Sequence, residues 1–563
     1  MTFSQVSQPG ATYMTWTWFS FPTPAGSINA IAVPATFRNE INSIYTLLAR
    51  SAVVNVWIAI LVCGMYFRLH ARMRNNRTPD ISDASCIMMS VWNNKVSPKE
   101  SLLRLLHSAT GEHRQEWWFY PLGFALLAAW VANIVAGIVI PGGLFIGNGA
   151  PVNPSSIYVP SVDTELSDSS NLIKALVLDA PSSLRAVGSV LMSEEMLGEK
   201  VLVGQPVPRG KTEDGQPVQQ ISYSFTVSGA DLGLQHYPQL TLNATGACIT
   251  DYSWHLETRN ITVDGRPAHQ DIYQTISGNV SASIYDGRAP SATFLAWDVH
   301  LMNVSWAAIV SSVDRGSSAP SSDPWYLTGP NPQYNRSDPS AAPYMVLPAR
   351  PVLLCWQNDQ WSYLGRTSDI SRLSSEALPG LHLSDGLQKV LLHYLRAPRI
   401  YNLGNDLGMS TLQSAALMAG SFFNADDSSI RTDLRRLVYA AYIATVNTLT
   451  DTTLHTPADP RKASVPNMVL DELGRVLPGV ADFVVYTNNV VTISLLHAIA
   501  IPCGALGSWL LTLLLLNTTA LKVVKTMDIA VLFSGLKEEF PNAGIALDGR
   551  SGKWVFTPIQ STA

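Results

Sequence analysis

The apolar stretches of the sequence place the strongest limit on how this chain can fold. Residues 119–141 and 490–516 contain no Asp, Glu, Lys or Arg and are rich in Ala, Val, Ile and Leu. About twenty such residues in an α-helix match the hydrocarbon thickness of a bilayer. The shorter stretch 51–67 is flanked by Arg50 and Arg68, whose long side chains can reach an interface. The sequence therefore predicts a membrane protein with about three α-helical spans.

The distribution of charge predicts how these spans are oriented. Residues 68–118 hold eight Lys and Arg against five acids, and two lysines follow the last span. Residues 144–487 instead hold twenty-two basic and thirty-two acidic residues. Because short cytoplasmic loops are enriched in Lys and Arg, we expect a cytoplasmic loop at 68–118 and a cytoplasmic tail at 517–563. The large domain, residues 142–489, is then extracytoplasmic.

The first 50 residues leave one alternative open. Residues 13–37 carry no charge but contain three prolines and a glycine, and no basic signal-peptide region precedes them. They form either an extracytoplasmic or interfacial segment or a fourth, weak span. In both cases the chain after Arg38 keeps its side of the membrane.

Five N-x-S/T sequons fall inside the acidic block, and none has proline at its middle position. They begin at Asn243, Asn260, Asn279, Asn303 and Asn335. All five are acceptors for N-glycans if the block faces a secretory lumen, whereas Asn76, in the basic loop, should stay bare. The sequons and the charge thus predict the same topology.

The five cysteines divide by compartment. Cys63 and Cys503 lie in predicted spans, and Cys86 lies in the cytoplasmic loop. Cys248 and Cys355 remain in the extracytoplasmic block, where oxidising conditions favour disulfides. We expect these two to form a disulfide, the alternative being two buried thiols.

The pattern within the large domain predicts an α+β fold with a β-rich first half and a helical second half. Alternation at Ile221, Tyr223, Phe225 and Val227 is typical of a half-buried strand, and similar runs recur between about 200 and 310. Residues 314–343 are rich in Pro and Ser and predict a surface loop or a domain boundary.

Helical signals begin after about residue 370. Ser410 and Gln413 form an S-x-x-Q capping box before an Ala- and Leu-rich run that ends at Phe423. A second helix is expected from the apolar stripe of Ile430, Leu434, Leu437 and Ala441, with start signals at Asp426, Asp427 and Ser428. Arg431, Arg435 and Arg436 would lie on its solvated face.

Specific catalytic motifs are missing from the sequence, including nucleophile elbows, HExxH, P-loops and dinucleotide-binding glycines. Asp298 and His300 are weak catalytic candidates because strand alternation would put both on one face, although a structural hydrogen bond between them is the better explanation. His236, His255 and His269 fit no metal-ligand spacing. We expect no cofactor and no metal.

Two further features have plain explanations. Asp426 and Asp427 could act as a carboxylate pair, but capping of the following helix explains them more simply. His497 is an ionisable group inside a predicted span, where it either relays protons or faces a neighbouring helix. The expected partners are the lipid bilayer and a protein or small-molecule ligand of the large domain. The net charge of −5 argues against nucleic acid.

Three segments carry a family resemblance. They are Arg350 to Tyr363 (RPVLLCWQNDQWSY), Arg435 to Thr445 (RRLVYAAYIAT) and Ile44 to Arg50 (IYTLLAR). With them the chain resembles a group of filamentous-fungal multi-span membrane proteins with a large extracytoplasmic domain. The resemblance implies this architecture and a fungal setting, and no catalytic residues. Some such proteins are encoded beside secondary-metabolite genes.

These observations favour an integral membrane glycoprotein of the plasma membrane or the secretory endomembranes, with a non-enzymatic binding or accessory role. One alternative is a membrane-tethered enzyme or accessory protein of a fungal secondary-metabolite pathway. Another is a transport accessory subunit, for which a polar seam of Asn55, Asn133 and His497 would be evidence.

Overall fold

The computed structural model describes residues 12–74, 143–161, 169–263, 266–275, 278–282, 291–299, 303–334, 342–416, 418–419, 422–454, 465–517, 543–547 and 554–558, with parts of 124–139. The chain forms two compact units. Unit 1 comprises Met1–Pro34 and Asn148–Thr492, and unit 2 comprises Ala35–Gly147 and Ile493–Ala563.

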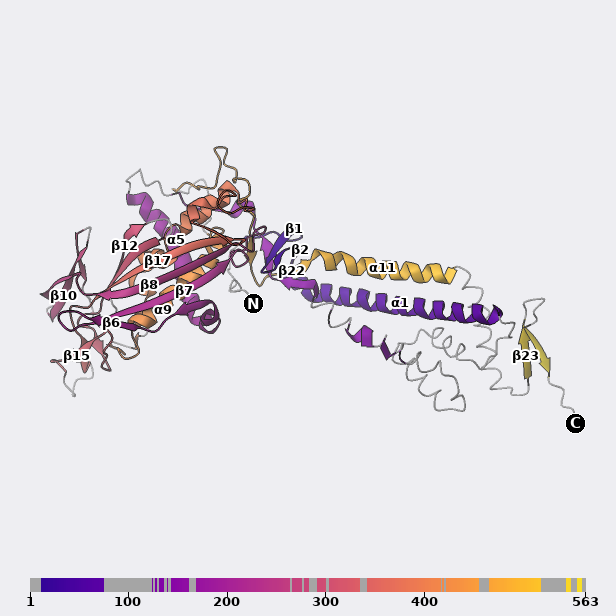
Figure 1. Cartoon of the computed structure of the whole chain (residues 1–563), viewed down its shortest axis with the longest axis horizontal. Helices are drawn as coiled ribbons and strands as arrows, with labels where there is room; N and C mark the ends of the chain where they lie inside the picture. Colours follow the sequence, from indigo (N-terminus) through magenta and orange to yellow (C-terminus); the bar gives the residue numbers. More distant parts are fainter. Residues whose placement is uncertain are drawn as a thin grey trace. The chain divides into compact units, whose positions relative to one another are not determined.

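Unit 1 is built around an eight-stranded sheet (Figure 1). Its strands are β5 (Val201–Val203), β6 (Val207–Lys211), β7 (Pro217–Ser228), β8 (Thr241–Asp251), β12 (Ser291–Val299), β13 (Asn303–Ser311), β17 (Val352–Tyr363) and β18 (Arg366–Ser368). The main order is β12-β13-β17-β8-β7-β5, and β18 and β6 pair with β17 and β7. Neighbouring strands are antiparallel throughout.

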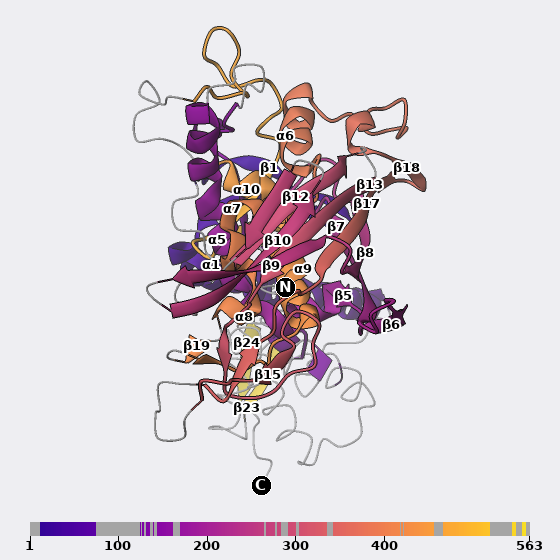
Figure 2. The ribbon, with the colours of Figure 1, turned by 90° about the vertical axis from the view of Figure 1, so that its left-hand side faces the viewer.

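One face of this sheet, here called the inner face, forms the main core with a layer of helices. The layer comprises α5 (Ser169–Lys200), α6 (Asp385–Leu395), α7 (Arg399–Leu407), α9 (Ile430–Val446) and the single turn α10 (Thr448–Asp451). The alternating residues predicted for β7 are all buried, and the ring of Phe225 meets that of Tyr442 of α9 edge to face at 5.9 Å. Figure 2 shows α9 behind the strands. The strand prediction for residues 221–227 is therefore confirmed.

Part of the outer face carries a second, smaller sheet. This sheet contains β9 (His255–Val263), β10 (Arg266–Thr275) and β11 (Gly278–Ala282) in the order β11-β10-β9. A separate apolar cluster joins Trp254 and Tyr273 to Ala307, Ile309 and Val352 on the outer face. The β-rich first half thus has a core on each side of one sheet.

The Pro- and Ser-rich segment 314–343 is not simply a surface loop. It contributes β14 (Gly316–Ser317) and β15 (Thr328–Pro330), which join β16 (Tyr344–Val346) in a small sheet. Trp325 and Tyr326, in the middle of the segment, are fully buried. The prediction failed because these two aromatic side chains enter the core while the prolines around them shape the backbone.

The capping box at Ser410 and Gln413 does not open a long helix. Only a single turn, α8 (Gln413–Ala416), forms, and it is followed by β19 (Met418–Ala419) and β20 (Phe422–Phe423). β20 also pairs with β14, so tertiary strand pairing overrides the local helix preference. The second predicted helix is present as α9, but Ser429 is its N-cap, one residue after the predicted start signals. Arg436, expected in solvent, is buried at 8% exposure.

The predicted interfacial segment 13–37 is a β-hairpin followed by one 3-10 turn. Its strands are β1 (Trp18–Thr23) and β2 (Gly26–Pro34), and η2 (Ala35–Phe37) follows. In the same sheet β2 lies beside β22 (Val490–Ser494). Residues 490–494, predicted to begin a span, are therefore strand.

Two long helices of unit 2 pack against each other. They are α1 (Arg38–Arg74), which begins well before the predicted start at residue 51, and α11 (Leu495–Asn517). The hydroxyl of Tyr45 donates to the carbonyl of Ala498, and that of Thr512 donates to the carbonyl of Asn55, each at 3.0 Å. Because both partners advance along the sequence together, the helices run in the same direction.

Both helices are long and apolar enough to cross a membrane, over Ala35–Ile60 and Leu495–Leu515. The third predicted span, 119–141, lies mostly outside the described residues, although its described fragments are helical. The fold is therefore a mixed α and β domain with two candidate spanning helices.

Candidate functional site

Of the predicted catalytic pair, Asp298 and His300, only Asp298 is among the described residues. Asp298 lies near the end of β12, next to a register shift between Ala296 and Asp298. His300 lies outside the described residues, so the pairing of the two side chains stays a prediction.

The three histidines of the β-rich half do not converge. His255 lies 3.0 Å from the hydroxyl of Thr258 and 3.4 Å from the carboxylate of Asp271. His269 lies 2.7 Å from Asp314 through its Nδ1. His236 packs its ring against Tyr237 instead. Within the described residues no three His, Cys, Asp or Glu side chains are placed to hold a metal ion.

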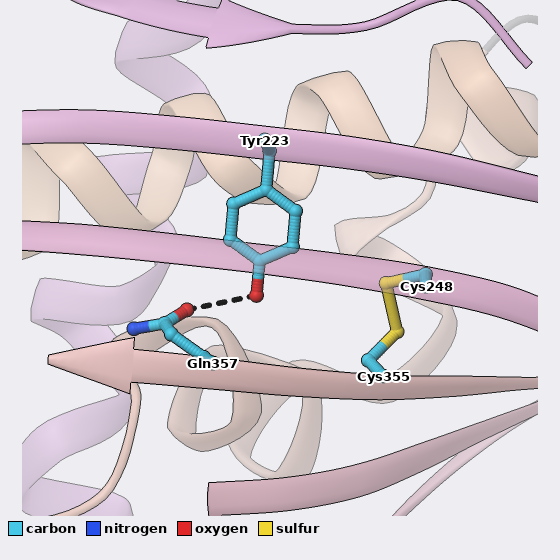
Figure 3. Close-up of a disulfide and its surroundings, with 4 residues drawn as sticks. All are labelled: Tyr223, Cys248, Cys355 and Gln357. Carbon is cyan, nitrogen blue, oxygen red and sulfur yellow. Dashed lines mark hydrogen bonds between the residues drawn. A yellow bond between two sulfur atoms is a disulfide. The ribbon is translucent and has the colours of Figure 1, made fainter. Parts of the chain in front are cut away.

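A disulfide joins the two central strands on the inner face of the sheet (Figure 3). Cys248 of β8 and Cys355 of β17 are directly opposite each other, with Cα atoms 4.0 Å apart, and both are buried. The bridge closes a separation of 107 residues. In the loop-entropy model a closure of that length contributes about 4–5 kcal/mol.

Beside the disulfide lies a buried chain of polar side chains from two strands, β7 and β17. The hydroxyl of Tyr223 donates to Gln357 Oε1 at 2.9 Å, and Gln357 Nε2 donates to Asp359 Oδ1 at 2.7 Å (Figure 3 shows the first of these bonds). A Cβ on Gly246 would come within 2.3 Å of the Tyr223 ring, so only glycine lets that ring lie across β8. Burial raises the pKa of Asp359 to about 6, and the hydrogen bond from Gln357 acts in the opposite direction.

The helical layer holds a second group of ionisable side chains, here called the acid–arginine cluster. Its members are Asp179 and Arg185 of α5, Arg399 and Asp406 of α7, and Asp451 of α10. Arg185 Nη2 lies 3.1 Å from Asp451 Oδ1, and the hydroxyl of Ser183 donates to Asp406 at 2.7 Å. Three carboxyl groups thus share two guanidinium groups.

Burial sets the protonation of this cluster. It raises the pKa of Asp179 to about 6; Arg399 opposes the rise, whereas the neighbouring carboxylates Asp406 and Asp451 add to it. Burial also raises the pKa of Asp406 and of Asp451. A carboxyl that titrates near neutrality can exchange protons under physiological conditions.

A third group, here called the sealed cluster, fixes the start of α9. Asp433 accepts bonds from the backbone N–H of Ser414 at 2.8 Å and, by a short contact, from the hydroxyl of Tyr326. Asp323 accepts from the backbone N–H of Ile430, the first residue of α9, at 3.1 Å. Arg315 stacks on Phe423 with its guanidinium 3.8 Å from the ring centroid.

The sealed cluster also corrects the prediction for Asp426 and Asp427. Ser429 forms the capping box with Thr432, and Asp323, about a hundred residues earlier, supplies the carboxylate at the helix start. Asp427 instead bonds to the side chain of Asn424 and is exposed. The sequence signal that was missed is a single acid inside an apolar helix stripe: Asp433 sits between Ile430 and Leu434.

Three sequon asparagines have described side chains. Asn260 of β9 and Asn279 of β11 are exposed, and Asn243 of β8 is half-buried, with its side-chain oxygen 2.9 Å from the hydroxyl of Thr226. Asn303 is the first residue of β13, and Asn335 lies outside the described residues. Glycan attachment at any of them stays a prediction.

Comparison with known proteins adds a family but no activity. Residues 180–485 match a family described as a domain of unknown function (DUF8406). No curated protein and no solved structure matches the chain. The matched residues fall entirely within unit 1 and cover more than half of the sequence. The chain belongs to the DUF8406 family.

Proposed function

We propose that the chain is an integral membrane glycoprotein, anchored by α1, α11 and the predicted span 119–141, whose unit 1 lies outside the cytoplasm and binds a partner. The observation that carries the proposal is the apolar surface of α11. Seven of its large apolar side chains are 49% to 71% exposed: Leu496, Ile499, Leu506, Trp509, Leu510, Leu511 and Leu514. Soluble proteins rarely leave so large a continuous apolar surface in water, whereas hydrocarbon would solvate it.

The direction of the two helices supports the topology. Since α1 and α11 run in the same direction, the segments that follow them, 75–118 and 518–563, leave the bilayer on the same side. The basic composition of 68–118 assigns that side to the cytoplasm. The strands β2 and β22, which precede the helices, then lie on the opposite side with the rest of unit 1.

Two features of unit 1 fit an oxidising lumen or the cell surface. Disulfides such as Cys248–Cys355 form and persist in oxidising compartments and are rare in the cytosol. The sequon asparagines Asn260 and Asn279 are exposed, as glycan attachment requires.

An exposed apolar stripe on α5 supports a binding role. Leu184, Leu191, Met192 and Met196 are 46% to 86% exposed, and they recur at helical spacing. Such patches mark sites of interaction with proteins or membranes, or grooves that bind ligands. Methionine side chains adapt to varied partner surfaces.

Gel mobility before and after N-glycosidase treatment tests the topology. We expect Asn260→Gln and Asn279→Gln each to remove one glycan, and Asn76→Gln to change nothing. Asn358→Gln on β17, which is outside any sequon, is the matched control. A chain without glycans, or a glycan on Asn76, would contradict the proposed orientation.

One observation favours a second candidate function, a membrane-tethered enzyme, which the fungal resemblance would place in secondary metabolism. Asp179, with a pKa near 6 beside Arg399, has the acid–base capacity that hydrolysis or isomerisation requires. Complementation of a deletion strain tests it. Full rescue by a glycosylated, normally folded Asp179→Asn chain would rule out catalysis by this cluster.

A further inference from the structure

One charged residue of unit 2 lies at an unexpected depth. The Thr512–Asn55 hydrogen bond sets the level of α1 beside α11. Arg50 precedes Asn55 by five residues, or about 7.5 Å along the helix axis. Because the helices run in the same direction, Arg50 is level with about Gly507, near the middle of α11.

Arg50 has no countercharge among the residues that the structure describes. Its side chain is exposed, and among the described residues it forms no ion pair or hydrogen bond. Exposed residues of the same helix face, Leu47, Ser51 and Val54, are apolar or small. Ala49 is buried on a different side of α1, and Trp57, also buried, lies two turns after Arg50 on the same side.

Snorkelling to a lipid headgroup does not solve the problem at this depth. The centre of a bilayer lies about 15 Å from either edge of its hydrocarbon core, which exceeds the length of an arginine side chain. Charged groups so placed almost always pair with another polar group inside the membrane. Arg50 therefore needs a partner within the bilayer.

The chain itself cannot supply this partner as a carboxylate. Residues 41–67, 119–141 and 490–516 contain no Asp or Glu. Glu40 lies ten residues before Arg50, or about 15 Å nearer the helix start. For the same reason a second copy of this chain brings no acid to that depth.

We propose that Arg50 docks a transmembrane helix of a different membrane protein through an Asp or Glu at the middle of that helix. The contact surface is the exposed face of α1 around Leu47, Arg50, Ser51 and Val54. Attraction between opposite charges in hydrocarbon selects the partner, and the small side chain of Ser51 lets the helix approach. This inference rests on the proposed function, because it requires α1 and α11 to span the bilayer, and it makes the chain an accessory subunit of a membrane complex.

Energy transfer in vesicles of phosphatidylcholine alone tests the inference with a defined probe. The full-length chain is reconstituted with a poly-leucine transmembrane peptide that carries one central Asp, or with the same peptide without Asp. We expect the Asp peptide to associate on the order of tenfold more tightly. Arg50→Leu should remove this preference, Arg50→Lys should retain part of it, and the neighbouring Ser51→Ala should retain nearly all of it.

Three outcomes would overturn the inference. Equal association of both peptides would show that Arg50 does not select an acid. An unchanged preference in Arg50→Leu would place the contact elsewhere. If anionic lipid abolished the preference of the wild-type chain for the Asp peptide, lipid phosphate would be the true partner of Arg50.

Glycan analysis and carbonate extraction of the same preparations distinguish a failure of the Arg50 inference from a failure of the proposed function. A glycosylated chain that resists carbonate extraction but shows no Asp preference refutes the role of Arg50 alone. A chain released by carbonate refutes the membrane anchoring and the inference with it.

Discussion

Two clusters of unit 1 contain buried carboxyl groups, and they stabilise these groups in different ways. In the sealed cluster, backbone N–H groups and hydroxyls bind Asp433 and Asp323. In the acid–arginine cluster, guanidinium groups stand beside Asp179 and Asp451. Both kinds of partner favour the charged carboxylate: the neutral donors do so through hydrogen bonds to its oxygens, and the arginines do so through their positive charge.

The two clusters also differ in their exposure to solvent, and this difference determines what each can do. The side chain of Asp433 is 0% exposed and ties the start of α9 to Ser414 and Tyr326, so it contributes mainly to stability. Arg185 has 36% of its side chain in solvent, so the acid–arginine cluster exchanges protons and ions with water more easily. We therefore expect mutations in the sealed cluster to unfold the domain and mutations in the other to change its response to pH.

Asp433→Ala should have the largest effect. It leaves the hydroxyl of Tyr326 and the N–H of Ser414 without their acceptor in a buried site. We expect the free energy of unfolding to fall by about 3–4 kcal/mol. Pulse proteolysis of the full-length chain in detergent measures this change.

Asp427→Ala is the matched control for that experiment. Asp427 lies just before the same helix but is exposed, so its loss should cost no more than about 0.5 kcal/mol. Similar losses in both variants would mean that the sealed cluster does not stabilise α9.

The sequence predicted the half-buried strands and the second helix, because the spacing of their apolar residues is sufficient to identify those elements. It could not predict the sealed cluster, which brings Asp323 to Ile430 across 107 positions of the chain. Nor could local signals reveal that β20 is a strand, since it pairs through Phe423 with Ser317 of β14, about a hundred residues earlier, as well as with β19. Arg50 was placed at a span edge because its depth depends on the packing of α1 on α11.

Asp179→Asn should change the pH dependence of stability. The folded pKa of about 6 lies above the unfolded value near 4, so burial of the neutral carboxyl stabilises the fold below pH 4. This contribution is lost as the pH rises toward 6. The variant should match wild type at pH 4 and exceed it at pH 7.5 by on the order of 1–2 kcal/mol, after allowance for solvent screening.

Glu195→Gln on the same helix, α5, is the control for the pH experiment. Its side chain is exposed, so its curve should run parallel to that of wild type. Unfolding free energies between pH 4 and 8 provide the comparison. If Asp179→Asn also runs parallel to wild type, the acid–arginine cluster is as insensitive to pH as the sealed one.

Tyr223→Phe should have the smallest effect and sets the scale for a single neutral hydrogen bond. The bond to Gln357 lies beside the disulfide, outside both clusters, and involves no arginine. Its loss should cost about 1 kcal/mol because Gln357 keeps its bond to Asp359. Tyr237→Phe, which removes an exposed hydroxyl bonded to the carbonyl of His382, should cost less. A loss in Tyr223→Phe as large as that in Asp433→Ala would show that the sheet core, and not charge burial, determines which polar groups the domain cannot lose.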